Sequence, residues 1–160
     1  MNQYANRYSP VLAWAYALGA LAVGALIAMT LKSLPPKIYT GIYAALIGGA
    51  GFAAAFTTRA RLRNVVGVFF VVGLVAAVTN YAIVSYFFKH AVSAMGNAMV
   101  TNDAGRANTA EAAGFMGRFF GIFAAAIGFL ETFIVGALAA KAGSKAREQA
   151  IAAPHSYRTA

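Results

Sequence analysis

Glu131 is the one acidic residue inside a long hydrophobic run of this 160-residue chain. The run covers residues 114–140, GFMGRFFGIFAAAIGFLETFIVGALAA, and is long enough to cross a bilayer. A charged carboxylate about halfway along such a run would cost about 3 kcal/mol on insertion scales. We therefore expect this carboxyl group to be protonated, paired or in contact with water. It can then bind a proton or a cation, hydrogen-bond a neighbouring helix to hold a fold or subunit contact, or face lipid or a ligand.

Other polar side chains within the hydrophobic runs have structural explanations. Thr79, Asn80 and Thr132 are candidates for hydrogen bonds between helices, because a buried amide or hydroxyl in lipid needs a partner. Arg118 lies about one turn inside the end of its run, where a long side chain can reach the headgroups. It is 13 residues from Glu131, about 20 Å along a helix, so the two cannot pair directly.

No known catalytic or cofactor motif occurs in the chain. There is no phosphate-binding loop, nucleophile elbow, zinc-binding helix or calcium loop. Cysteine is absent, and His90 and His155 both lie outside the hydrophobic runs. The sequence thus predicts no haem, no metal and no other cofactor. It favours a non-catalytic protein over an enzyme, since no acid, base and nucleophile come together within the runs.

Four hydrophobic runs must position these residues. They predict helices at about 11–31, 38–58, 64–88 and 112–140, and 61% of the residues are hydrophobic, with a mean hydropathy of +0.66. Ser9 and Pro10 form a helix start, and paired prolines separate the first two runs. We therefore expect an all-α polytopic membrane protein, with four transmembrane helices in a compact bundle forming a single membrane domain over residues 1–160.

The segments outside the runs are more polar. Residues 89–110 are predicted to form the longest loop, with a short surface helix in its first half and a turn around Asp103. Asn108 and Glu111 have the spacing of a capping box for the fourth helix. Residues 141–160 are predicted to form a basic cytoplasmic tail, helical up to Pro154.

The distribution of basic residues predicts the topology. The net charge is +9, and one side of a four-helix arrangement would hold both termini and eight basic residues, against four on the other side. Three of the eight are Arg59, Arg61 and Arg63, which predict a topology anchor that also contacts lipid headgroups or a partner. Both termini are thus expected in the cytoplasm, in a bacterial inner membrane. The chain contains no basic patch interleaved with aromatic residues, so the sequence does not predict nucleic-acid binding.

Small residues recur along one stripe of the fourth run. The stripe repeats at spacings of three and four residues and consists of Gly114, Gly117, Gly121, Ala125, Gly128, Thr132 and Gly136. Such a stripe lets helix backbones approach closely, so it predicts tight packing inside the bundle or against another chain. By counting depth from Ala140, we expect Glu131 to lie level with Gly19, residues 48–51 and Gly73, where neighbouring backbones leave room.

Residues 128–140, GFLETFIVGALAA, resemble the fourth helix of the proteolipid subunit of V-type rotary ATPases. In that family the corresponding glutamate carries the transported proton, and this role would fall on Glu131. The resemblance covers about one helix. The first and third runs lack the dense glycine repeats of that family, and the arginine triplet and the polar segment before the fourth run are not features of it.

These observations favour a non-catalytic accessory or structural subunit of a larger membrane complex, which packs through its glycine-rich fourth helix. The alternative is a proton- or cation-binding transporter or rotor-type oligomer that uses Glu131. Its expected partners are the lipid bilayer and other membrane subunits or copies of itself, and nucleic acid is not among them.

Overall fold

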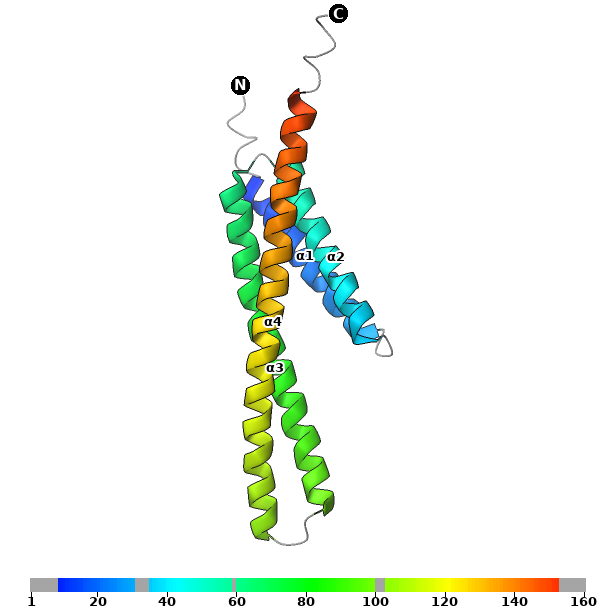
Figure 1. Ribbon diagram of the computed structural model, residues 1–160, viewed down its shortest axis with the longest axis vertical. Helices are drawn as coiled ribbons and strands as arrows, with labels where there is room; N and C mark the ends of the chain where they lie inside the picture. Colours follow the sequence, from blue (N-terminus) through cyan, green and yellow to red (C-terminus); the bar gives the residue numbers. More distant parts are fainter. Residues whose placement is uncertain (1–8, 31–34, 59, 100–102, 153–160) are drawn as a thin grey trace, which may run out of the picture. The chain divides into compact units, whose positions relative to one another are not determined.

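The computed structural model describes residues 9–30, 35–58, 60–99 and 103–152, which form four helices (Figure 1). These are α1 (Ser9–Thr30), α2 (Pro36–Thr57), α3 (Leu62–Met99) and α4 (Asp103–Ala152). Of the described residues 97% are helical, and none of them forms a strand. All four helices are long and apolar enough to span a membrane. The predicted all-α fold with four transmembrane helices is therefore confirmed.

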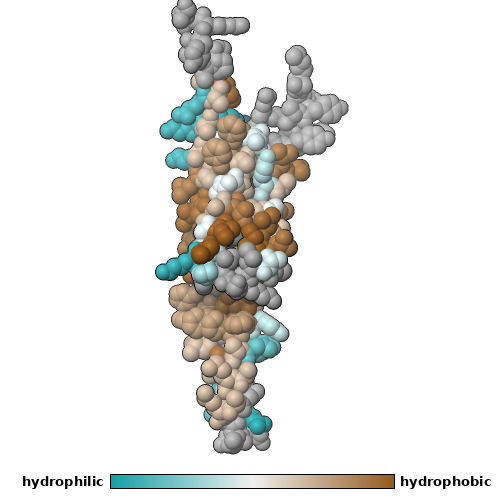
Figure 2. All heavy atoms as spheres, turned by 90° about the vertical axis from the view of Figure 1, so that its right-hand side faces the viewer, coloured by the Kyte–Doolittle hydropathy of each residue, from teal (hydrophilic) through white to brown (hydrophobic). Residues whose placement is uncertain are grey.

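Large apolar side chains point outward from every helix. Leu26 of α1, Val78 of α3 and Leu138 of α4 are each more than 60% exposed. Figure 2 shows hydrophobic side chains over much of the visible face. A surface of this kind is suited to lipid or to other membrane proteins, because removing so much apolar surface from water lowers the free energy.

The proline pair before α2 positions that helix. Pro35 is the N-cap residue, and its carbonyl accepts hydrogen bonds from the backbone N–H groups of Ile38 at 2.9 Å and Tyr39 at 3.2 Å. Pro36 takes the first helical position, where its missing N–H leaves no bond unmade. α1 likewise begins at Ser9, as the Ser-Pro pair predicts.

The helices α3 and α4 extend further than the sequence predicts. α3 continues to Met99 instead of ending near residue 88, and α4 runs from Asp103 to Ala152 instead of 112–140. The predicted separate surface helix is therefore wrong, because residues 89–99 continue α3, and the predicted capping box is wrong, because Asn108 lies inside α4. The predicted turn falls partly on residues 100–102, which lie outside the described residues. These segments are rich in alanine and contain no proline, so nothing in them stops a helix. The expected helical tail extends to Ala152, and Pro154 lies outside the described residues.

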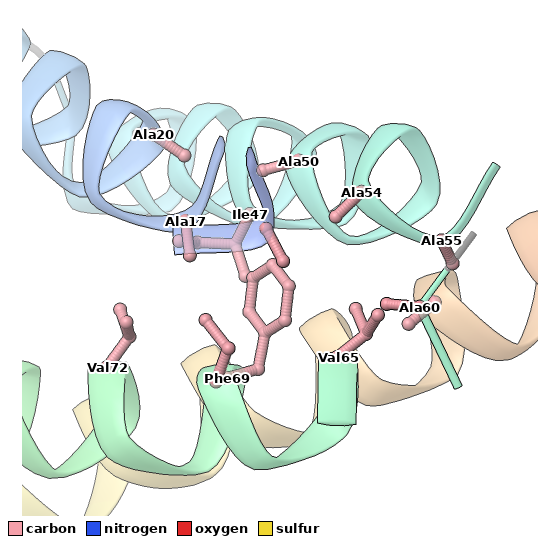
Figure 3. Close-up of a cluster of buried hydrophobic side chains, with 13 residues drawn as sticks. Ala17, Ala20, Ile47, Ala50, Ala54, Ala55, Ala60, Val65, Phe69 and Val72 are labelled. Carbon is pink, nitrogen blue, oxygen red and sulfur yellow. The ribbon is translucent and has the colours of Figure 1, made fainter. Parts of the chain in front are cut away.

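The structure contains two compact units, Met1–Gly73 with Leu130–Ala160, and Leu74–Phe129. The first unit contains α1, α2, the start of α3 and the C-terminal part of α4. Its buried cluster combines many alanines with a few larger side chains (Figure 3). Phe69 of α3 points at Ile47 of α2 and Ala17 of α1, and all three are fully buried. Small residues surround one aromatic ring, so the helices approach closely around it.

The second unit is an antiparallel hairpin of the remaining parts of α3 and α4. The hydroxyl of Ser85 donates a 3.0 Å hydrogen bond to the carbonyl of Gly117. The rings of Phe88 and Phe120 stack with their centroids 4.6 Å apart. Each unit thus has its own packing, and the prediction of a single membrane domain stays a prediction.

Candidate functional site

A hydrogen bond between side chains of α2 and α4 marks the candidate site. The hydroxyl of Tyr43 lies 2.9 Å from Oγ1 of Thr132, and Thr132 is fully buried. Tyr43 also fits against Gly24 of α1, since a Cβ at residue 24 would lie 2.8 Å from its ring. Thr132 therefore makes the interhelical contact that its position predicts, and its partner is a tyrosine that the sequence analysis did not single out.

The carboxyl group of Glu131 lies next to this hydrogen bond. Its side chain is half-buried, and its Oε1 atom is buried without a hydrogen-bond partner among the described residues. Glu131 directly precedes Thr132 on α4, and a charge on its carboxyl group would act on the phenols of Tyr39 and Tyr43. The two tyrosine rings stack with centroids 6.3 Å apart, and the Tyr39 hydroxyl lies 3.5 Å from the carbonyl of Gly24. The site thus combines a carboxyl group with three hydroxyl groups.

The predicted depth of Glu131, near the middle of its span and level with small residues, stays a prediction. α2 and α4 approach each other closely at Gly51, where an added Cβ would lie 2.5 Å from the carbonyl oxygen of Gly136. A Cβ at Gly48 would lie 3.5 Å from the side chain of Val135. Residues 48–51 of α2 thus pack against the turn of α4 that follows Glu131.

The other predicted polar residues lie apart from this site. Asn80 is half-buried, and its side chain lies against Gly128 of α4, as a residue facing another helix should. Thr79 is exposed and donates to the carbonyl of Val75 at 2.9 Å within its own helix, so the expected interhelical role is wrong for Thr79. Arg118 is exposed, in keeping with a side chain that reaches headgroups.

The predicted arginine anchor is partly described. Arg61 and Arg63 are exposed at the start of α3. Arg59 lies outside the described residues. A contact that the sequence does not reveal lies nearby, because the guanidinium of Arg147 donates a 2.6 Å hydrogen bond to the carbonyl of Thr58. This bond holds the C-terminal part of α4 against the connection between α2 and α3.

Most of the glycine stripe on α4 packs inside the chain. A Cβ added at Gly117 would lie 2.8 Å from the carbonyl of Ser85, and one added at Gly121 would collide with the Ser85 side chain. A Cβ added at Gly128 would likewise collide with the side chain of Asn80, and one added at Gly136 would collide with the ring of Phe69. Gly114 differs, since no atom of the described residues lies within 4 Å of its Cβ position, so its predicted packing role stays a prediction.

Two further stripes of small residues, one on α1 and one on α2, remain open. A groove of about 460 Å³ runs between α1 and α2. Among its lining residues are small or short side chains at intervals of four, namely Ala15, Gly19 and Val23 from α1 and Ala45, Gly49 and Ala53 from α2. No atom of the described residues lies within 4 Å of the Cβ positions of Gly19 and Gly49. The four-residue spacing of these small side chains is the sequence pattern that indicates the two stripes.

The four membrane-length helices, the Tyr43–Thr132–Glu131 site and the open groove define this chain as a helical membrane protein. The chain matches no known protein family, no curated protein and no solved structure. The resemblance of residues 128–140 to a rotary ATPase proteolipid therefore remains a local analogy.

Proposed function

We propose that this protein is a non-catalytic subunit of a larger membrane complex and that it receives a transmembrane helix of a partner in the groove between α1 and α2. The observation that carries this proposal is the open pair of small-residue stripes that contains Gly19 and Gly49. The fourth helix, which the sequence favours as the docking surface, uses all its stripe glycines except Gly114 within the chain. The groove is therefore the better surface for a partner.

The physical argument is one of close approach. Helices in lipid associate mainly through van der Waals packing, because lipid tails are as apolar as the side chains. Small residues on two adjacent helices let a third helix come near both backbones at once. Larger side chains of that third helix would fill the groove and make contacts that lipid chains, which are disordered, make less well.

Substitutions in the groove test the proposal. Gly49→Leu and Gly19→Leu have room in the isolated chain, since no atom lies within 4 Å of either Cβ position, but they would obstruct a docked helix. Gly41→Leu and Gly67→Leu are matched controls, because both sites are equally open and neither lines the groove. We expect the groove variants to lose the native complex after mild solubilisation and the controls to keep it. Complexes retained by both groove variants would contradict the proposal.

A second candidate function is proton or cation binding at Glu131. The specific observation in its favour is the buried Oε1 atom, which has no hydrogen-bond partner among the described residues, beside the hydroxyls of Tyr39, Tyr43 and Thr132. An unpaired buried oxygen costs free energy unless a proton, ion or water satisfies it. Reversible proton binding needs only this carboxyl group and no further residue.

A transport measurement separates the two candidates. The full chain is reconstituted in vesicles that contain a pH-sensitive dye, and proton flux is compared between the natural protein and Glu131→Gln. A proton carrier loses its flux in the variant, while a purely structural subunit shows no flux difference. A hydrophobic carbodiimide, which modifies protonated carboxyl groups, provides a second measurement, because mass spectrometry locates the adduct at Glu131 only if a protonated form is accessible.

A further inference from the structure

Two basic segments that are far apart in the sequence lie at one end of the first unit. One contains Arg61, directly before α3, and Arg63, in the first turn of α3. The other is the part of α4 that contains Lys141 and Lys145. All four side chains are exposed. The bond from Arg147 to the carbonyl of Thr58 ties the two segments together.

The packing beneath these cations is firm. Ala140 is fully buried in the same cluster as Ala60 and Val65. A Cβ at Gly143 would lie 2.4 Å or 3.0 Å from backbone atoms of Phe52, so α4 approaches α2 backbone to backbone there. The exposed cations therefore project from a fixed scaffold on two elements.

The charge of this region is strongly positive. The described cations are Arg61, Arg63, Lys141, Lys145 and Arg147, and Glu148 is the acid on the same stretch of α4. Arg61 and Arg63 lie where α2 ends and α3 begins, and Arg147 of α4 contacts the same connection at Thr58. The end of a membrane-spanning helix pair is where it meets the headgroups. Phosphate groups there are the nearest available anions.

We infer that Arg61, Arg63, Lys141 and Lys145 form one binding surface for the phosphate groups of anionic phospholipids. Arginine forks and lysine ammonium groups both hydrogen-bond phosphate oxygens, and they do so more strongly beside a low-dielectric membrane than in bulk water. Because the four cations belong to two segments, a lipid bound there would also bridge α4 to the start of α3.

Native mass spectrometry of the purified full chain tests this inference. The protein in neutral detergent is titrated with phosphatidylglycerol or phosphatidylcholine, and the bound lipids are counted. We expect preferential retention of phosphatidylglycerol, weakened about fivefold for each cation removed. The variants are Arg61→Gln/Arg63→Gln and Lys141→Gln/Lys145→Gln, while Arg147 stays unchanged because it holds the fold.

The control variant is Lys89→Gln/Arg106→Gln, which removes two exposed cations from the other unit. It should keep the preference, and circular dichroism should show every variant folded. Equal loss in the control would mean a general charge effect and would overturn the inference. Equal binding of phosphatidylglycerol and phosphatidylcholine would also overturn it, as would full displacement of the lipid by inorganic phosphate at the same concentration. A third contrary result is a set of variants that bind lipid as before but lose an acidic protein partner.

Discussion

The hydroxyl groups of Tyr43 and Thr132 lie 2.9 Å apart, and this hydrogen bond joins α2 to α4 beside the carboxyl group of Glu131. Thr132 is fully buried, so this bond is made inside the first unit. Glu131 directly precedes Thr132, so the one acid of the hydrophobic runs lies one residue away from a hydrogen bond between two helices.

Removing this hydrogen bond should weaken the first unit. Tyr43→Phe and Thr132→Val are each expected to lower the free energy of unfolding by about 0.6 kcal/mol, with little further loss in the double variant. Unfolding in mixed micelles of increasing denaturing detergent measures this double-mutant cycle. Tyr39→Phe is the control, because its hydroxyl lies 3.5 Å from its acceptor and contributes less. Strictly additive losses would show that the two hydroxyls do not interact.

Glu131→Gln and Glu131→Lys should differ sharply in stability. The amide resembles a neutral carboxyl group in size and hydrogen bonding, so we expect the Gln variant to accumulate and unfold like the natural protein. A lysine within the span should cost about 3 kcal/mol. The yield of membrane-inserted protein and its thermal midpoint measure both effects. A Gln variant as unstable as the Lys variant would indicate that the carboxylate is charged and paired.

Gly51→Ala should destabilise the protein although it adds only one methyl group. Its Cβ would lie 2.5 Å from the carbonyl oxygen of Gly136, and a backbone carbonyl in a helix cannot move aside as a side chain can. The expected loss is about 1–3 kcal/mol. Gly41→Ala, on the same helix with open space at its Cβ position, should be neutral or slightly stabilising. If both variants unfold at the same temperature, α2 and α4 do not approach this closely.

Arg147→Gln should loosen the connection between α2 and α3. The variant shortens the donor that reaches the Thr58 carbonyl, and the partly buried bond contributes about 1 kcal/mol. We expect faster hydrogen exchange and proteolysis around residues 58–61. Lys89→Gln removes an equal charge from an exposed side chain of the second unit and should leave both rates unchanged. Equal acceleration in the two variants would point to charge instead of the hydrogen bond.

The hydrophobic runs predict the four helices well, since about twenty apolar residues have few alternatives to a membrane helix. The helix ends are predicted less well. Paired prolines mark the start of α2, whereas the alanine-rich residues on both sides of 100–102 contain no stop signal and continue as α3 and α4. A moderately polar segment can be helical or a loop, and its sequence does not decide which.

The sequence predicts some residues of the candidate site and not others. Glu131 stands out as an acid in an apolar run, and Thr132 as its polar neighbour. Tyr43 does not, because a tyrosine near a helix end is typical of the membrane interface and its partner depends on a long-range register. The same limit applies to the glycines, since the sequence identifies small stripes but does not indicate whether the chain itself covers them, as at Gly136, or leaves them open, as at Gly49.

Site-specific photo-crosslinking in native membranes tests the proposed docking groove most directly. A photoreactive residue is placed at position 19, 41, 49 or 67, and the product masses are compared. We predict that positions 19 and 49 capture the same partner subunit, while positions 41 and 67 capture none, because only the first pair lines the groove. Crosslinks to lipid alone at positions 19 and 49, or the same products at all four positions, would contradict a helix-binding role for this groove.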